Sequence, residues 1–343
     1  VALAYDRQNL YALDLDDDAI KVFAKSGKFE RVIGREGQGP GEFEMPTDLD
    51  VLDGKLYVAD SGNRRIQILD KKGNYLTGFR VPFSPHRLLA LDPERVVVLK
   101  LPTGLTGPEK VLHGFDISGR LLWKSIDSFY SGDSVYDLMR NRLFIRRGTD
   151  GGFFVIPGAN DRLIRRLNRD GGLLEGIELS KEYPFQEILI PGRGGQKKSL
   201  LGLCWNCAVE AEKIFLLIPE WTEDRDLGPG RQLAVVSLRG QIEAYIDLPE
   251  RLTRFAVEKD RIYGFDTDYR LRLFSFKKNS SRNCMGQSGV RCNEFPPFAK
   301  GGMKGESIPK ILFSPDPSFQ KERRDMRSRT KNIRSPIRKP DEP

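Results

Sequence analysis

The sequence predicts an all-β fold, and within that class a six-bladed β-propeller of four-stranded antiparallel blades. The first observation behind this prediction is an internal repeat, because residues 56–60, 66–69 and 73 match residues 10–14, 20–23 and 27 at a displacement of 46 positions. The second is that looser copies of this unit follow, which brings the total to six. The third is that each unit consists of short apolar runs separated by turn residues, with almost no helical period. A single blade cannot bury both of its faces, whereas blades packed around a ring can.

The second unit shows the pattern most clearly. Its four strands are predicted at residues 48–53, 55–60, 65–70 and 75–80. The turns between them contain Gly54, Asn63 and Gly73, residue types that tolerate positive φ. The same pattern places the six blades at about residues 1–34, 48–80, 87–126, 141–179, 200–248 and 254–276.

The last blade and the end of the chain depart from the pattern. No obvious fourth strand follows residue 276, so we expect residues that preceded Val1 to supply it and ring closure to be incomplete. Residues 279–343 are rich in Ser, Pro, Gly, Lys and Arg and poor in aliphatic residues, so they cannot bury enough apolar area to offset the entropy lost on ordering. We therefore expect one propeller, residues 1–278, followed by a disordered basic tail, residues 279–343.

The net charge of +8 resides in the tail. Residues 277–343 carry 16 Lys and Arg against 7 Asp and Glu, whereas the remainder carries 40 against 41. A nearly neutral body gives no reason to expect a nucleic-acid partner. Four Cys are too few for a disulfide-stabilised scaffold, and no apolar run approaches the roughly 20 residues of a membrane-spanning helix. The first 22 residues hold no signal core, but the chain begins without Met, which leaves a removed export signal open.

One stretch of the chain carries a family resemblance. Residues 32–46 and 56–68 resemble the linker and body of an NHL repeat, and the positions that match its motif are Gly39, Pro40, Gly41, Phe43, Pro46, Asp60 and Asn63. The whole chain resembles the bacterial six-bladed β-propellers built from such repeats. The resemblance implies a secreted or periplasmic location, and we expect a monomer. The match is weak in the third to fifth units, where insertions interrupt it at residues 101–110, 186–199 and 222–230.

Two motifs have both a structural and a chemical interpretation. The glycines between residues 34 and 41 precede Pro46 and another strand rather than a helix, which favours a linker over a phosphate-binding loop. Asp14, Asp16 and Asp18 crowd one hairpin and are weak candidates for binding a cation such as Ca²⁺. Because the Gly and Glu of an EF-hand loop are missing, a solvated turn is favoured.

Cysteine and histidine offer little for catalysis. Cys204 and Cys207 have the spacing of a redox or zinc pair, but residues three apart on a strand point to opposite faces. Buried structural thiols are favoured, with a local disulfide or a partial metal site as alternatives. His86 and His113 are the only imidazoles and cannot form a three-His metal site. We therefore assign no catalytic residue and expect no cofactor.

The observations together favour a non-enzymatic propeller that serves as a rigid platform for a protein, peptide or glycan partner. The candidate contact residues, chosen for loop position and for charged or amphipathic character, are Arg64, Arg193, Lys197 and Trp221. One alternative is a metal-dependent, lactonase-like hydrolase with carboxylate ligands at the central channel. A second alternative is RNA or anion binding through the basic loop at residues 192–198.

Overall fold

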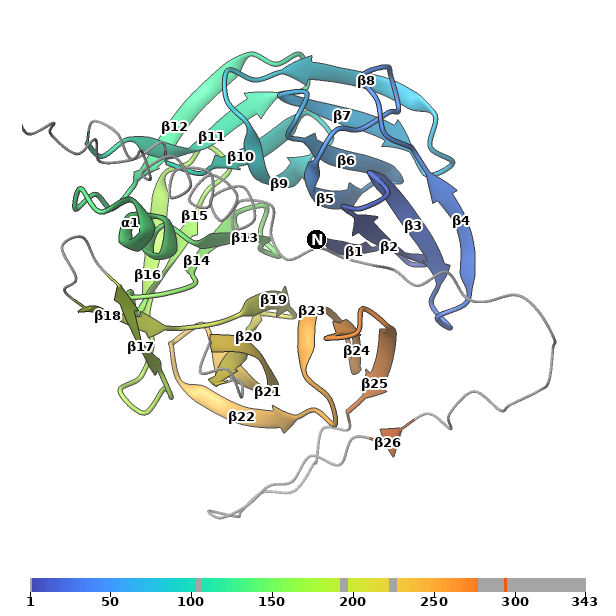
Figure 1. Ribbon diagram of the computed structural model, residues 1–343. Coiled ribbons are helices and arrows are strands. Elements are labelled where there is room, and N and C mark those ends of the chain that lie inside the picture. Colours follow the sequence, from blue (N-terminus) through green and yellow to red (C-terminus); the bar gives the residue numbers. More distant parts are fainter. Residues whose placement is uncertain (1, 103–106, 192–196, 222–226, 277–292, 295–343) are drawn as a thin grey trace, which may run out of the picture.

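The computed structural model describes residues 2–102, 107–191, 197–221, 227–276 and 293–294. Six four-stranded sheets stand around a central axis, and the chain passes through them in order (Figure 1). Within each sheet the neighbouring strands are consecutive in the chain and antiparallel. The predicted all-β, six-bladed propeller is thereby confirmed.

The blades are numbered here in chain order, and each runs from an inner strand at the axis to an outer strand at the rim. The first three blades are formed by β1 (Leu3–Tyr5), β2 (Asn9–Asp14), β3 (Ala19–Ala24) and β4 (Phe29–Ile33); β5 (Pro46–Leu52), β6 (Lys55–Asp60), β7 (Arg65–Asp70) and β8 (Tyr75–Arg80); and β9 (Pro85–Asp92), β10 (Arg95–Lys100), β11 (Lys110–Asp116) and β12 (Leu121–Asp127). The last three are formed by β13 (Leu143–Arg147), β14 (Phe153–Pro157), β15 (Leu163–Leu167) and β16 (Leu173–Glu178); β19 (Asn206–Glu210), β20 (Lys213–Trp221), β21 (Leu227–Ser237) and β22 (Ile242–Asp247); and β23 (Leu252–Glu258), β24 (Arg261–Asp266), β25 (Leu271–Ser275) and β26 (Asn293–Glu294).

Two elements lie outside the blades. The helix α1 (Ser134–Arg140) lies between the third and fourth blades, and the hairpin of β17 (Gln186–Pro191) and β18 (Lys197–Gly202) lies between the fourth and fifth. The sequence analysis places an insertion at residues 186–199 and starts the fifth blade at about residue 200. In the structure, residues 186–191 pair with residues 197–202, and β19 begins at Asn206. The charges of this segment obscure the alternation that marks a hairpin.

The strands of the second blade lie where the sequence places them. β6, β7 and β8 have the predicted bounds, and β5 begins at Pro46 rather than at residue 48. A proline is tolerated at the first residue of a strand, because its missing N–H removes no interior ladder bond.

Burial depends on the position of a strand within its blade. All six residues of β2 are buried, whereas five of the six residues of the outer strand β16 are exposed. Adjacent blades cover both faces of the second strands, such as β2 and β14, so these strands are buried along their whole length rather than on alternate residues.

The first and last blades pack against each other and close the ring. Their shared core contains Leu10, Ala12 and Phe23 from the first blade and Tyr263 and Phe265 from the last. The closure therefore includes side-chain packing between the first and last blades.

The fourth strand of the last blade differs from the prediction. It is β26, a two-residue strand in which Asn293 and Glu294 pair with Ser275 and Phe274 of β25. The expectation that residues before Val1 supply this strand is wrong, since β26 holds the place beside β25. Two residues carry no periodic pattern, which is why the sequence did not reveal them. The rest of the predicted disordered tail, residues 279–343, lies outside the described residues.

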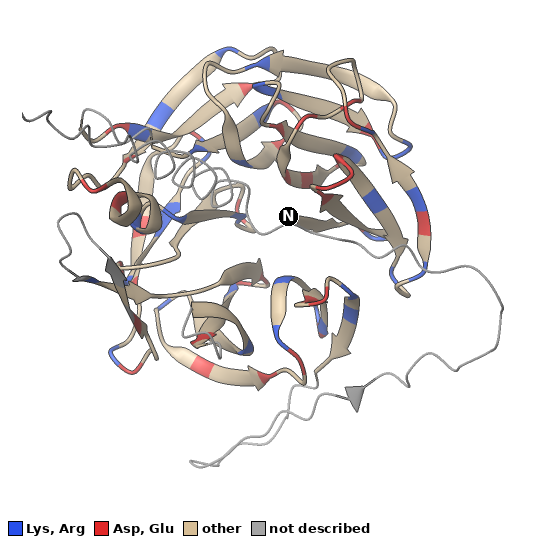
Figure 2. Cartoon of the chain, in the orientation of Figure 1, with Lys and Arg blue, Asp and Glu red and all other residues tan. Residues whose placement is uncertain are grey.

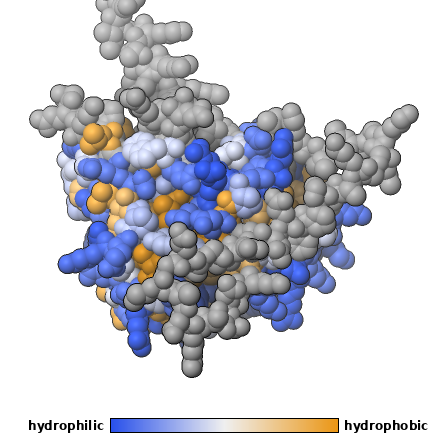
Figure 3. All heavy atoms as spheres, turned by 90° about the horizontal axis from the view of Figure 1, so that it is seen from below, coloured by the Kyte–Doolittle hydropathy of each residue, from blue (hydrophilic) through white to orange (hydrophobic). Residues whose placement is uncertain are grey.

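The exterior of the ring is mixed in character. Basic and acidic residues are interspersed around it (Figure 2), in keeping with the nearly neutral body. On the side that lies at the bottom of Figure 1, hydrophobic residues are scattered among hydrophilic ones (Figure 3). Among the described residues, no helix has the length and apolar character that crossing a membrane would require.

Candidate functional site

The two faces of the ring differ in the length of their connections. Because the strands of each blade alternate in direction, the links between blades and the turns between second and third strands emerge on one face, called here the loop-rich face. This face receives α1, the β17–β18 hairpin and the ends of β10, β11, β20 and β21 that flank two longer connections. The turns of the opposite face that lie within the described residues are two to five residues long. Within the described part of the chain, insertions therefore accumulate on one face.

Of the predicted contact residues, Arg64 and Trp221 belong to this loop-rich face. Arg64 is exposed in the turn between β6 and β7, where it adopts φ +51°. Trp221 ends β20 with 44% of its surface exposed, and its carbonyl accepts a hydrogen bond from Arg251. Lys197 begins β18, but its side chain and the whole of Arg193 lie outside the described residues. The same holds for most of the basic loop at residues 192–198.

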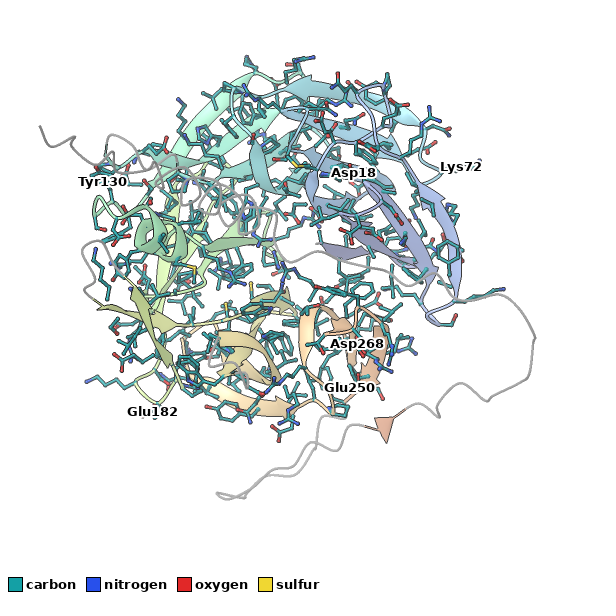
Figure 4. All side chains as sticks on the ribbon, in the orientation of Figure 1. Asp18, Lys72, Tyr130, Glu182, Glu250 and Asp268 are labelled. Atoms are coloured by element: carbon teal, nitrogen blue, oxygen red, sulfur yellow. The ribbon has the colours of Figure 1, made fainter. Side chains whose placement is uncertain are left out.

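The helix α1 and the β17–β18 hairpin form one unit on the loop-rich face. Asp133 caps α1 by accepting the N–H of Tyr136 at 3.2 Å, and it also pairs with Lys198 Nζ at 3.2 Å. The Lys198 ammonium lies 5.0 Å from the Tyr136 ring centroid, and the Tyr136 hydroxyl donates to the Ser199 carbonyl at 3.4 Å. Two insertions from separate blade connections thereby support each other. Tyr130 is exposed in the same connection as α1 and lies near the rim (Figure 4).

The motif residues of the second blade have structural roles. Asp60 is fully buried, and its carboxylate accepts hydrogen bonds from the Glu44 N–H (2.8 Å), Asn63 Nδ2 (3.0 Å) and Arg65 Nε (2.6 Å). Phe43 is fully buried in the core between the first two blades. This network fastens the blade-to-blade linker to the β6–β7 turn.

The remaining linker positions support the same arrangement. The N–H of Gly39 donates to Glu42 and that of Gly41 to Gln67, both at 2.9 Å, whereas Pro40 is exposed. These contacts agree with the linker interpretation of the glycines.

The aspartates of the first hairpin do not converge on one point. Asp14 is buried and pairs with Lys21, whereas Asp18 accepts the Met45 N–H of the next blade at 3.1 Å. Asp16 is exposed in the turn between them. Among the described residues, no group of three or more His, Cys, Asp and Glu side chains is arranged to hold a metal ion.

Cys204 and Cys207 are brought together but are not bonded. Both thiols are free, buried and members of one apolar core. They can converge because Cys204 precedes β19, so that the backbone between them is not a regular strand. Burial and the hydrogen bond to Cys207 raise the pKa of Cys204 well above its usual value. The buried-thiol interpretation fits this geometry.

The inner strands of all six blades line a central cavity of about 270 Å³. Its wall carries a set of charged side chains that the sequence-based site prediction missed: Asp48, Asp50, Arg87, Arg146, Arg147 and Arg254. These residues lie on four strands far apart in sequence, so no motif joins them. The available signal was the recurrence of charged residues within the inner strands.

One arginine and one aspartate of this wall form a direct ion pair. Arg147 Nη2 donates to Asp50 at 2.6 Å and its Nε to the Ala90 carbonyl at 3.0 Å. Asp50 also accepts the Ala90 N–H at 2.9 Å. The pair therefore connects the inner strands of the second, third and fourth blades.

Asp48 is the second carboxylate of the channel. It accepts the Leu88 N–H at 3.0 Å. Burial raises the pKa of Asp48, although the charges of Arg87 and Arg146 act in the opposite direction. Within the described wall, the carboxylates thus number two, and the arginines outnumber them.

Comparison with known proteins agrees with the fold. Residues 2–97 match a family described as a 6-bladed beta-propeller. No curated protein matches the sequence. Among solved structures, an exported-protein candidate from Bacteroides fragilis shares 13% identity over 77% of this chain and 78% of that chain, with a TM-score of 0.54.

Two enzymes share the architecture at similarly low identity. Virginiamycin B lyase from Staphylococcus aureus is 11% identical over 87% of this chain and 84% of its own, with a TM-score of 0.50. Hydrazine synthase from Kuenenia stuttgartiensis is 11% identical over 80% and 82%, with a TM-score of 0.51. At such identities the likeness concerns the fold alone, and the NHL name stays a prediction. The architecture and the family match together identify this chain as a six-bladed β-propeller protein.

Proposed function

We propose that this protein is a non-enzymatic binding platform whose loop-rich face engages a protein, peptide or glycan partner. The observation that carries the proposal is the accumulation of insertions on one face of a rigid ring. Sheets fix the frame, and loops that extend from it on one side can vary for recognition without loss of the fold.

The side chains exposed on this face support recognition. Trp221, Tyr130 and Arg64 belong to the three residue types that most often dominate binding energy at interfaces. Leu189 and Leu201 of the hairpin are also exposed. An aromatic, apolar and basic surface of this kind suits a partner with both apolar and acidic groups.

The channel favours binding over hydrolysis. A lactonase-like hydrolase needs several carboxylate or amide ligands around one metal ion. Of the two carboxylates in the described wall, Asp50 is paired with Arg147 and Asp48 with a backbone N–H. This wall suits anions better than cations.

The test is a screen of the full-length protein on peptide and glycan arrays, followed by affinity measurements on loop-rich-face variants. We expect Trp221→Ala and Arg64→Glu to weaken the best ligand at least tenfold without lowering the melting temperature, because a hot-spot residue contributes about 2 kcal/mol or more. Lys72→Glu is the matched control, since Lys72 lies exposed in the β7–β8 turn of the opposite face, at the outer edge of the ring (Figure 4). Loss of binding in Lys72→Glu but not in the other two variants would contradict the proposal.

A further inference from the structure

The channel contains a buried arginine that lacks an acidic partner. Arg87 of β9 is 5% exposed, its guanidinium carbon lies over the Phe144 ring, and it forms no ion pair with a described carboxylate, although its charge acts on Asp48. Its Nε is shielded from solvent and has no partner. Arginine is almost never fully buried unless paired, because an unpaired charge away from water is costly. Such a charge indicates a place where a ligand completes the site.

A second guanidinium lies beside the first. Arg146 of β13 donates to the carbonyls of Cys207 and Ile145, both at 2.8 Å, and has no carboxylate partner among the described residues. The guanidinium carbons of Arg87 and Arg146 lie 4.8 and 5.7 Å from the centroid of the same ring, Phe144. The two cations therefore occupy one corner of the channel, supported by a buried aromatic ring.

The local charges leave this corner positive. Arg147 and Asp50 neutralise each other, so within the described wall Asp48 is the remaining carboxylate against Arg87, Arg146 and Arg254. This excess of positive charge suits an anion. Carboxylate is the monoanion whose planar pair of oxygens fits a guanidinium.

A neutral polar group completes the corner. Asn206 of β19 lines the same cavity, is 2% exposed, and has an Oδ1 atom without a hydrogen-bond partner. It can accept a hydrogen bond from a hydroxyl or amide N–H that neighbours the carboxylate. The cavity of about 270 Å³ has room for a single group of this size rather than for a polymer.

We propose that the central channel is a carboxylate-binding site in which Arg87 and Arg146 hold the anion and Asn206 accepts a neighbouring hydroxyl or amide. The carboxylate belongs to a peptide or to a uronic acid of a glycan. The assignment of the carboxylate to a peptide or glycan rests on the proposed function. Binding of a small carboxylate in the channel does not require the loop-rich face.

The experiment is isothermal titration of the full-length protein at constant ionic strength with four probes. Sodium glucuronate and N-acetylglycine carry the carboxylate, and glucose and N-acetylglycinamide are their neutral counterparts. We expect at least one acid to bind at least tenfold more tightly than its neutral counterpart, and the preferred acid identifies the source. No difference between acid and neutral probes, or tighter binding of inorganic phosphate than of both acids, would overturn the proposal.

Variants separate binding from folding. Arg87→Gln and Arg146→Gln are each expected to weaken the preferred acid at least tenfold. Arg80→Gln, which removes an exposed arginine of β8, is expected to change nothing. Arg87→Gln also removes a charge that favours ionised Asp48, so the double variant Asp48→Asn/Arg87→Gln, in which neither charge remains, is expected to melt at the wild-type temperature. A lower melting temperature of this double variant together with lost binding would assign Arg87 a structural role and overturn the proposal.

Failure here and failure of the proposed function are distinguishable. If the acids do not bind but array ligands still depend on Trp221, the platform function is supported and the channel site is refuted. If the acids bind through Arg87 and no array ligand depends on Trp221, the channel site is supported and the platform function is refuted.

Discussion

Asp18 carries a charge that the fold disfavours. Burial raises the pKa of this carboxyl to about 6, and the nearby acidic groups of Glu36, Asp60 and Glu44 also raise it, whereas the Met45 N–H lowers it. The folded protein therefore binds more protons here than the unfolded chain between about pH 4 and pH 6. Its stability falls as the pH rises through that range.

The variant Asp18→Asn should remove this penalty. The amide keeps an oxygen that can accept the Met45 N–H, so the turn is retained. We expect the variant to be more stable than the wild type by roughly 1 kcal/mol at pH 7, after discounting for partial exposure, and equally stable at pH 4. Urea unfolding at both pH values measures this. The same difference in unfolding free energy between the two proteins at pH 4 and at pH 7 would contradict this expectation.

His113 has the opposite effect on pH dependence. It packs against Phe83 with ring centroids 4.7 Å apart, and its Nδ1 has no hydrogen-bond partner. Burial lowers the pKa of His113 to about 4, and the charges of Lys124 and Lys100 act in the same direction. The unfolded chain binds more protons between about pH 4 and pH 6.5, so stability is lost as the pH falls through that window.

The variant His113→Leu should be less sensitive to acid. Between pH 7 and pH 4, we expect its free energy of unfolding to fall by roughly 2 kcal/mol less than that of the wild type falls. Chemical denaturation at several pH values gives the difference. An NMR titration showing that His113 protonates near pH 6.5 in the folded protein would refute the assignment.

At the residue scale the sequence revealed turns better than the site. Asp60 and Asn63 were recognisable because a repeated turn motif contains them. Arg87 and Arg146 were not, because their significance arises only when two inner strands meet at the axis.

The repeated glycine that marks each unit has a purpose at the scale of the blade. Gly119 turns the chain between β11 and β12 with φ +89°, and a Cβ added there would lie 2.7 Å from the Cβ of Phe79 in the preceding blade. Likewise, a Cβ added at Gly73 of the second blade would lie 2.8 Å from Cγ2 of Ile33 in the first blade. The glycine thus serves both the turn and the close packing of neighbouring blades.

The substitution Gly119→Ala should combine both penalties. Positive φ costs about 1 kcal/mol, and the clash with Phe79 adds about 1–3 kcal/mol. Gly54→Ala is the matched control, because Gly54 has φ +75° but its added Cβ would meet only the flexible end of Lys71 at 3.5 Å. Equal destabilisation of the two variants in urea unfolding would contradict the packing role.

The accuracy of the strand prediction varied along the chain for a physical reason. Three strands of the second blade were found to the residue because Gly and Asn turns delimit them. The β17–β18 hairpin was missed because its charged residues obscure the alternation, and β26 was missed because it holds only two residues. Their positions depend on the neighbours that they pair with, which local sequence does not encode.

The ring as a whole depends on contacts between residues far apart in sequence. The Tyr5 hydroxyl donates to the Val257 carbonyl at 2.6 Å, and Lys25 pairs with Glu258 at 2.7 Å. The Lys25 ammonium also lies 4.6 Å from the Tyr263 ring centroid. The repeat predicted six blades packed around a ring, and these contacts show which side chains join the first blade to the last.

Zero-length carbodiimide coupling of the monomeric protein, followed by mass spectrometry, tests this closure most directly. The reagent joins an amine and a carboxylate that form an ion pair. Lys100 and Glu109, which pair within the third blade, are the control, because their side-chain exposures of 14% and 27% match the 15% and 27% of Lys25 and Glu258. A closed six-bladed ring predicts both the Lys25–Glu258 and the Lys100–Glu109 products, whereas the Lys100–Glu109 product alone would contradict it.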